Sequence, residues 1–288
     1  MESQDIKNLV SKMTLEEKAG LCSGEDFWHT KAVERLNIPA IMMSDGPYGL
    51  RKQEAEADHL GINESIPAVC FPTGVSMASS FNRELVKKLG ETLGEECQAE
   101  NIAVLLGPAM NIKRSPLCGR NFEYYSEDPL LAGKMGAAMV RGIQSQHIAA
   151  AVKHFACNNK ETNRKHSDSR VSERALREIY LKAFEIIVKE ADPWVIMSAY
   201  NMINGHRASE NHDLLEGILR DEWHFHGMVT SDWWTRGEHY KEIKAGNDVK
   251  MACGFPERVK KAMELGALDR SDLERCAKRV LDLILKID

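Results

Sequence analysis

Polar and charged side chains stand where several short apolar runs of this sequence end. The residues concerned are Asp45, Asn111, Lys153, His154, Tyr200, Asn201 and Asp232. One such residue is most often an ordinary turn or helix cap, but groups from five separate runs favour another explanation. If the runs are parallel strands of a barrel, their carboxyl ends meet on one face, where sites are built. The sequence therefore predicts a shared polar pocket.

The residue types in this pocket suit the chemistry of sugars. Asp232 is followed by Trp233 and Trp234, and Lys153 is adjacent to His154. An indole face packs on the apolar C–H face of a pyranose, while carboxylate, lysine and histidine side chains bind its hydroxyls. The residues alone also allow a simpler interpretation, namely core tryptophans beside a helix-capping aspartate and a surface lysine beside a buried histidine.

Other kinds of site have less support. The ten histidines include the pair His224 and His226, but there is no HExxH motif and no run of Cys and His ligands. The phosphate-binding motifs GxGxxG and GxxxxGK[ST] are absent, and so is the GxSxG nucleophile elbow. We therefore expect neither a metal nor an organic cofactor.

Hydrophobic periodicity indicates the elements that must position these residues. Seven short strand-like runs alternate with helical patterns, which predicts parallel strands joined by helices. The runs centre on residues 40–44, 74–78, 103–106, 150–154, 194–198, 228–231 and 248–251. Most are almost continuously apolar, as expected for strands covered on both faces. The predicted fold is an α/β protein of the (β/α)8 TIM-barrel type over residues 1–288, with its eighth strand unassigned.

The sequence also predicts where some helices begin and which of their faces are apolar. Thr14 with Glu17, and Ser271 with Glu274, have the spacing of capping boxes. After Ser172, an apolar stripe at 3.6-residue spacing predicts one continuous amphipathic helix. Its members are Leu176, Ile179, Tyr180, Ala183, Phe184, Ile187 and Val188.

Composition narrows the class of protein. Of 288 residues, 43% are hydrophobic and 28% charged, which excludes a wholly disordered chain. A net charge of −5 implies no surface for nucleic acid. No apolar run approaches the ~18 residues of a membrane span, and the polar first residues do not suggest a secretory signal peptide. Seven scattered cysteines without a CxxC pair predict reduced thiols and a cytoplasmic location.

Short motifs along the chain resemble the barrel domain of family 3 glycoside hydrolases, the β-glucosidase group. They are Met13-Thr-Leu-Glu-Glu-Lys-Ala19, Ser44-Asp-Gly-Pro47, Gly119-Arg-Asn-Phe-Glu123, Ser126-Glu-Asp-Pro129, Lys153-His-Phe155, Glu161-Thr-Asn-Arg164, Met197-Ser-Ala-Tyr-Asn201 and Ser231-Asp-Trp233. Each motif is weak alone, and their order and spacing carry the resemblance over almost the whole chain. It implies retaining hydrolysis of terminal β-D-glycosides, with glucosides as the first expectation.

The resemblance also implies roles for single residues. Asp232 resembles the nucleophile that forms a covalent glycosyl-enzyme intermediate, and Tyr200 resembles the tyrosine that hydrogen-bonds this nucleophile. Met197 and Trp233 resemble apolar walls of the sugar site. The residues that resemble the ring binding the sugar hydroxyls are Asp45, Arg51, Arg120, Lys153, His154 and Arg164. Their positive charges would lower the pKa of the nucleophile.

The general acid/base is where the chain departs from the family pattern. Two-domain members take it from a second α/β sandwich domain, which we expect to be missing here, so that its docking surface is exposed or self-associates. Single-domain hexosaminidase members carry a His–Asp pair in a KHFPGHG-type loop, a pattern that loop 156–161 lacks. Glu161, His166 and Asp168 are candidate substitutes. Three hypotheses stand: a β-glucosidase barrel impaired in isolation, a sugar-binding barrel without activity, and a single-domain β-N-acetylhexosaminidase.

Overall fold

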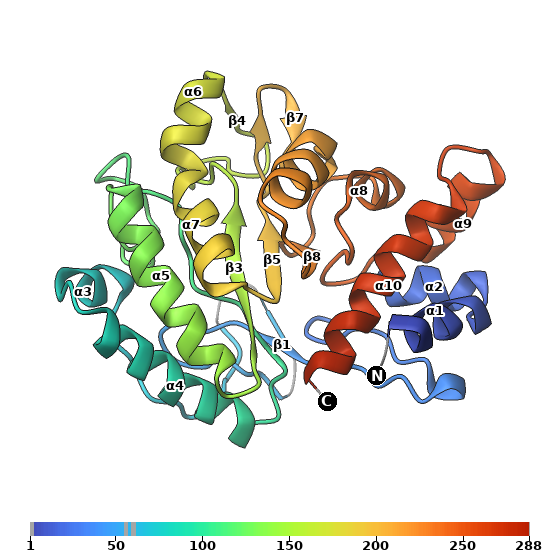
Figure 1. Ribbon diagram of the computed structural model, residues 1–288, viewed down its shortest axis with the longest axis horizontal. Helices are drawn as coiled ribbons and strands as arrows, with labels where there is room; N and C mark the ends of the chain where they lie inside the picture. Colours follow the sequence, from blue (N-terminus) through green and yellow to red (C-terminus); the bar gives the residue numbers. More distant parts are fainter. Residues whose placement is uncertain (1–2, 55–56, 59–61, 288) are drawn as a thin grey trace.

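The computed structural model describes residues 3–54, 57–58 and 62–287, and a parallel sheet forms its centre (Figure 1). The five strands of this sheet, in spatial order, are β1 (Met43–Ser44), β2 (Val104–Leu105), β3 (Ala149–Phe155), β5 (Val195–Ser198) and β8 (Met228–Ser231). All neighbouring strands are parallel. Five of the seven predicted strand runs are thereby confirmed.

Isolated β-bridges continue the sheet from β8 back to β1. They pair Thr230 with Val249, Ser23 with Lys250, Gly24 with Thr30, and His29 with Met42. The first two bridges are parallel and the last two are antiparallel. The α/β class and the barrel type are therefore confirmed. Within the described residues, however, the sheet returns on itself irregularly instead of through eight equal βα units.

Two of the predicted strands form differently. Residues 74–78 belong to helix α3 (Gly74–Ser79), so a strand was the wrong prediction there. The Thr73 side chain accepts a hydrogen bond from the backbone N–H of Ser76 and caps this helix. A short apolar run cannot by periodicity alone separate a strand from a buried helix. Residues 248–251 form only the bridges at Val249 and Lys250.

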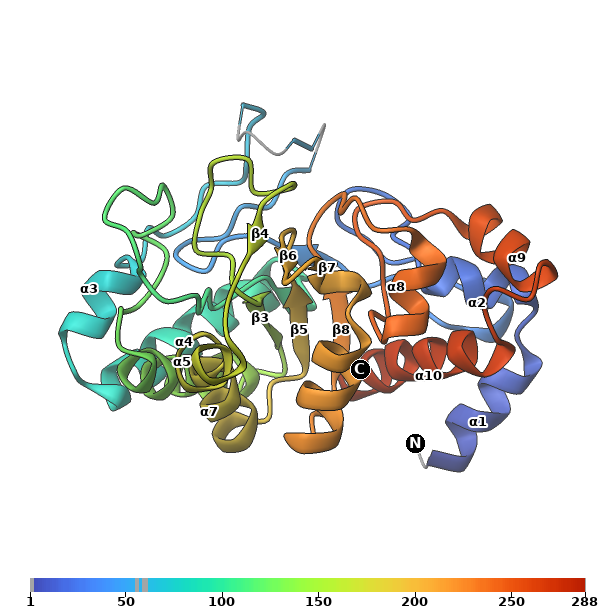
Figure 2. The ribbon, with the colours of Figure 1, turned by 90° about the horizontal axis from the view of Figure 1, so that it is seen from above.

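Helices pack around the sheet in two groups (Figures 1 and 2). The first group, in which neighbours contact one another, is α4 (Arg83–Ala99), α5 (Pro129–Gln144) and α7 (Lys182–Ala191). The second group lies at the other end of the molecule and comprises α1 (Ser3–Lys12), α2 (Leu15–Leu21), α9 (Pro256–Glu264) and α10 (Arg270–Ile287).

Shorter elements occupy the connections. The helical ones are η1 (Glu34–Leu36), α6 (Glu173–Ala175), η2 (Leu176–Tyr180), η3 (Ala208–Glu210), η4 (Asp213–Glu222) and α8 (His239–Ala245). A small second sheet joins β4 (Asp168–Ser169), β6 (Met202–Ile203) and β7 (His206–Arg207). None of the helices in the described part of the chain is long and apolar enough to cross a membrane.

The observed helix starts and buried faces agree only partly with those predicted from the sequence. The capping box at α2 is confirmed, because Thr14 and Glu17 bond each other's backbone N–H through their side chains. The second box was wrong, since α10 begins at Arg270 and Ser271 lies inside it. The helix after Ser172 is also interrupted by a π-helical turn, η2. The wider π turn shifts the apolar stripe and leaves Ile179 41% exposed.

Both faces of the central strands are buried, which explains their continuous apolar sequence. Along β3, Ala150 and Val152 belong to the core cluster that also contains buried residues of α4, α5 and α7. Ala149 and Ala151 belong to the other cluster, together with buried residues of α2 and α10. Side chains therefore alternate between two cores along the strand.

Candidate active site

One cavity of about 420 Å³ brings together the ten residues to which the resemblance assigned roles in catalysis and sugar binding. Asn111 and Asn201, which were expected on the same face, do not line it. They are Asp45, Arg51, Arg120, Lys153, His154, Arg164, Met197, Tyr200, Asp232 and Trp233. Several of these residues directly follow or end a parallel strand, so their approach follows from the common direction of the strands. The predicted shared polar pocket is present.

A strand irregularity places Lys153 and His154 in the same cavity although they are neighbours in sequence. The pairing of β3 with β5 shifts register between Val152 and Phe155. Strict alternation would send the two side chains to opposite faces, and a bulge of this kind re-aims one of them. The Asn111 carboxamide accepts a hydrogen bond from the His154 N–H at 3.0 Å and donates one to its carbonyl oxygen at 2.9 Å. Asn111 thereby satisfies the backbone that has left the regular ladder.

A buried network of charges forms one side of the cavity. The Lys153 Nζ lies 2.9 Å from Asp45 Oδ1 and 3.3 Å from Glu123 Oε1, and Arg120 Nε donates to Glu123 Oε2 at 2.7 Å. Burial would raise the pKa values of Asp45 and Glu123, but the Lys153 and Arg120 charges outweigh it and lower both. Both carboxyl groups are therefore ionised at neutral pH.

Glu123 is a cavity residue for which the sequence predicted no role. It closes the motif Gly119-Arg-Asn-Phe-Glu123, so its position was marked, but its partner Lys153 is distant in sequence. The aromatic side chains of Phe27, Trp28 and Phe122 also line the cavity and were not predicted.

Asp232 follows β8 directly, and its carboxylate lines the cavity. Its Oδ1 accepts a hydrogen bond from the Trp233 N–H at 2.7 Å. Its Oδ2 lies 3.8 Å from His154 Nε2 and has no hydrogen-bond partner among the described residues. The residue is 8% exposed. Burial raises the pKa of Asp232, and the charges of Arg120, Arg164 and Lys153 oppose this rise.

His154 faces Asp232 as a neutral imidazole. Burial and then the nearby Arg120, Lys153 and Arg164 charges hold the pKa of His154 well below its usual value. The contact with Asp232 is therefore not an ion pair at neutral pH. An uncharged ring leaves the carboxylate available to other partners.

Tyr200 is bonded to the turn that carries Asp232. Its hydroxyl donates to the carbonyl oxygen of Trp233 at 2.6 Å. A hydrogen-bonding interaction with the Asp232 carboxylate also contributes to the raised pKa of the phenol. Burial, followed by the Asp232 charge, raises the pKa of Tyr200, so the phenol is protonated at neutral pH. Tyr200 thus contacts the turn at Asp232 both through the Trp233 backbone and through the Asp232 carboxylate.

The remaining predicted residues complete the walls. Arg51 Nη1 lies 3.8 Å from Asp45 Oδ2. The Arg164 guanidinium stacks 4.9 Å from the centre of the Tyr200 ring. Trp233 Nε1 donates to the carbonyl oxygen of Phe27 at 2.7 Å, which fixes the indole plane.

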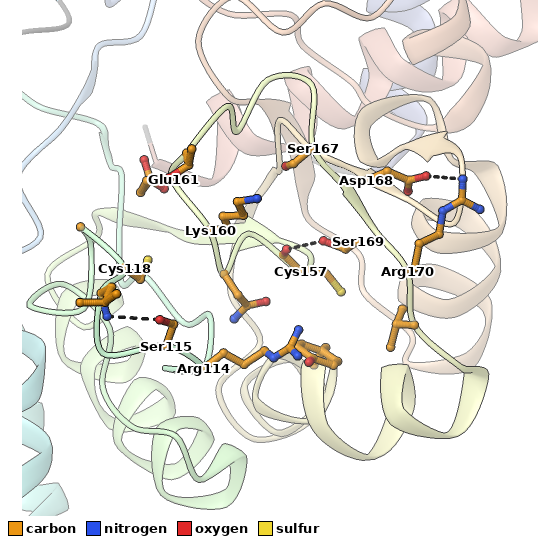
Figure 3. Close-up of a pocket in the computed structure, with 16 residues that line it drawn as sticks. Arg114, Ser115, Cys118, Cys157, Lys160, Glu161, Ser167, Asp168, Ser169 and Arg170 are labelled. Carbon is orange, nitrogen blue, oxygen red and sulfur yellow. Dashed lines mark hydrogen bonds and ion pairs between the residues drawn. The ribbon is translucent and has the colours of Figure 1, made fainter.

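None of the three candidate substitutes for the general acid lines this cavity. Glu161 and Asp168 line a neighbouring pocket of about 640 Å³ (Figure 3). Glu161 Oε2 accepts from Arg164 Nη1 at 2.8 Å, and Asp168 is turned toward Arg170, with 2.7 Å between Oδ2 and Nη2. His166 is exposed and lines neither pocket.

The described residues therefore bring only one carboxyl group with a raised pKa to the cavity, and that group is Asp232. The other carboxylates lining it, Asp45 and Glu123, are paired with cations. Within the same ranges, no three His, Cys, Asp or Glu side chains are grouped as a metal site. All seven cysteines are free.

Comparison with known proteins decides the family. The family described as "Glycosyl hydrolase family 3 N terminal domain" matches residues 16–283. The chain belongs to glycosyl hydrolase family 3. A thermostable β-glucosidase B of Acetivibrio thermocellus is 52% identical over 283 residues, which are 97% of this chain and 38% of that protein. An exo-α-(1→6)-L-arabinopyranosidase of Bifidobacterium longum is 48% identical, over 96% of this chain and 37% of that protein.

Solved structures of family 3 proteins show the same fold. The β-glucosidase of Kluyveromyces marxianus in complex with glucose superimposes with a TM-score of 0.93 at 42% identity. The match covers 98% of this chain and 34% of that one. This family 3 chain thus spans little more than a third of the length of the relatives it matches.

Proposed function

We propose that this chain is the sugar-binding and nucleophile-bearing part of a retaining β-glycosidase acting on terminal β-D-glucosides. The observation that carries the proposal is the geometry at Asp232: a buried carboxylate with one unpartnered oxygen, facing a cavity with cations on its other side. The names of the relatives, β-glucosidases above all, agree with this choice.

The proposed reaction proceeds in two displacements. Asp232 Oδ2 attacks the anomeric carbon of the glycoside, and the bond from that carbon to the leaving-group oxygen breaks with its electron pair. A glycosyl ester on Asp232 results, and water then attacks the same carbon from the opposite face, so the configuration is retained. Arg120, Lys153, Asp45 and neutral His154 bind the sugar hydroxyls, and hydrogen bonds to charged partners are the stronger ones.

The proton for the leaving group must come from a group outside the described cavity residues. We propose that a further α/β sandwich domain, or a second copy of this chain, supplies it. Two exposed apolar side chains support the proposal that another domain or a second copy covers this side of the molecule. Leu117, which lines the neighbouring pocket, is 92% exposed, and Phe122, which lines the sugar cavity, is 55% exposed. Seven unpaired thiols support a cytoplasmic location.

Trapping of the intermediate tests the proposal. Dinitrophenyl β-glucoside needs no proton for its leaving group, so one equivalent of dinitrophenolate should appear rapidly. The mass of the peptide containing Asp232 should rise by one glucosyl residue. Asp232→Asn should release nothing and acquire no mass. Glucose binding without trapping would instead favour a sugar-binding barrel that has no activity of its own.

Substrate preference separates the remaining hypotheses. Nitrophenyl β-glucoside and nitrophenyl α-L-arabinopyranoside should both outcompete nitrophenyl N-acetyl-β-glucosaminide for the cavity. Fast turnover of the N-acetylglucosaminide by the chain alone would support a single-domain hexosaminidase, and Glu161, His166 and Asp168 would then be mutated first.

A further inference from the structure

A buried ion pair outside the sugar cavity contacts two loops, the one that follows Asp232 and the one that follows Tyr200. Lys250 Nζ lies 2.7 Å from Glu242 Oε2, and the two residues are 1% and 0% exposed. Neither lines the cavity. Lys250 stands in the segment bridged to Thr230 and Ser23, and Glu242 lies in α8.

Lys250 binds the loop that follows Asp232 at three oxygens. Its ammonium donates to Thr235 Oγ1 at 2.8 Å, to the Gly237 carbonyl oxygen at 3.0 Å and to the Thr235 carbonyl oxygen at 3.3 Å. The loop passes so close to Glu242 that a Cβ on Gly237 would overlap with Glu242 Oε1. Residues 235–237 are therefore in direct contact with both members of this pair.

Glu242 joins that loop to the one that carries Tyr200. Its Oε1 accepts hydrogen bonds from Thr235 Oγ1 at 2.6 Å and from Ser209 Oγ at 2.7 Å. Ser209 belongs to η3, whose first residue, Ala208, donates its N–H to the carbonyl oxygen of Asn201, next to Tyr200. One carboxylate thus ties the Asp232 loop and the Tyr200 loop together.

Stability alone gives no reason for such a pair. Replacing a buried ion pair by apolar side chains of similar volume is often neutral or stabilising, whereas removing one partner leaves an uncompensated charge. Apolar side chains could not form the directional hydrogen bonds that this pair makes to Thr235, Gly237 and Ser209. A nucleophile must be held within about 0.5 Å of its productive position. Bonds that hold its loop therefore affect the rate at which it attacks the substrate.

We propose that Glu242 and Lys250 are positioning residues, which fix the loop bearing Asp232 and Trp233 relative to Tyr200. The inference rests on the proposed function, because its effect on rate is felt through attack by Asp232. The proposed sugar-binding groups belong to other strands, because Asp45 follows β1 and Lys153 lies in β3.

The test compares Lys250→Met with Arg220→Met in the intact chain. Arg220 also forms a buried ion pair, 2.8 Å from Asp248, but it binds the carbonyl oxygen of Gly227 at the opposite end of β8. Lys250→Met should slow dinitrophenolate release from dinitrophenyl β-glucoside by about tenfold or more, while its affinity for glucose changes less than about threefold. Arg220→Met should lower the melting temperature but leave trapping by the folded protein unchanged.

The double variant Lys250→Met/Glu242→Gln separates positioning from stability. It removes both charges, so its melting temperature should recover relative to Lys250→Met. Its trapping rate should remain low, because the bonds to Thr235 and Gly237 are still missing. If trapping recovers together with stability, or if Arg220→Met slows trapping equally, the two residues are merely structural and the inference is wrong.

Amide hydrogen exchange of residues 232–237 gives a second readout that needs no sugar chemistry. Exchange in this loop should accelerate in Lys250→Met and in the double variant, and not in Arg220→Met. If the protein without substitutions forms no glucosyl ester on Asp232, the proposed function is wrong. Amide hydrogen exchange then still decides whether the Glu242–Lys250 pair restrains the loop. Unchanged exchange in Lys250→Met would overturn the positioning role by itself.

Discussion

The carboxamide of Asn111 exchanges two hydrogen bonds with the backbone of His154, at 2.9 and 3.0 Å, where the β3–β5 pairing changes register. Both residues are buried. The two bonds replace ladder bonds that the bulge removes, and they let Lys153 and His154 enter one cavity. The shape of the candidate site therefore depends on a side chain that does not line the cavity.

Asn111→Leu should destabilise the protein and loosen the site. It leaves one N–H and one carbonyl group buried without partners, at a cost of about 1–3 kcal/mol each. Urea unfolding should show the loss, and calorimetry should show weaker glucose binding. Asn111→Asp keeps the acceptor for the His154 N–H but places a carboxylate oxygen against the His154 carbonyl oxygen, so it should be destabilised as well. Equal glucose affinity in Asn111→Leu and the unchanged protein would contradict this account.

Lys153→Ala should weaken glucose or gluconolactone binding about tenfold or more. A desolvated hydrogen bond from a charged donor contributes about 1.5–3 kcal/mol, and the substitution also leaves Asp45 and Glu123 facing each other without their shared cation. Lys134→Ala is the matched control, because Lys134 pairs with Glu190 at the surface. Isothermal calorimetry that gives all three proteins the same affinity would place the sugar elsewhere.

Asp232→Asn should stabilise the protein at neutral pH while abolishing trapping. The folded pKa of Asp232 lies above the usual 3.8, because burial disfavours the charged form. A raised carboxyl pKa favours folding fully only below the unfolded value and loses this contribution as pH rises through the folded pKa. The melting temperature of Asp232→Asn should thus exceed that of the unchanged protein at pH 7. The difference should shrink toward pH 4, and a constant difference would argue against a raised pKa.

Added azide should release the sugar trapped on Asp232. Among the described cavity residues, Asp45 and Glu123 are paired with cations and the pKa of His154 is held well below its usual value, so none of them is suited to activate water. General acid/base assistance typically contributes about 10²–10⁴-fold to the rate. Azide needs no base, so turnover of dinitrophenyl β-glucoside should accelerate and yield β-glucosyl azide. Cellobiose, with its poor leaving group, should be nearly inert with or without azide. Ordinary hydrolysis of cellobiose that does not respond to azide would mean that an acid lies within this chain.

The sequence by itself determined the family and the five main strands, and it singled out ten of the residues that line the cavity. It could do so because the apolar periodicity of a strand and the polar residue that ends it are both local, and parallel strands bring their ends to one face. Only the tertiary structure decided that residues 74–78 form a helix, that a π turn exposes Ile179, and that Glu123 is shared by Lys153 and Arg120. The same holds for Glu242, whose partners Ser209, Thr235 and Lys250 come from three different segments. A residue type states which bonds a side chain can form, but the distances between segments far apart in sequence are set by how the whole chain packs.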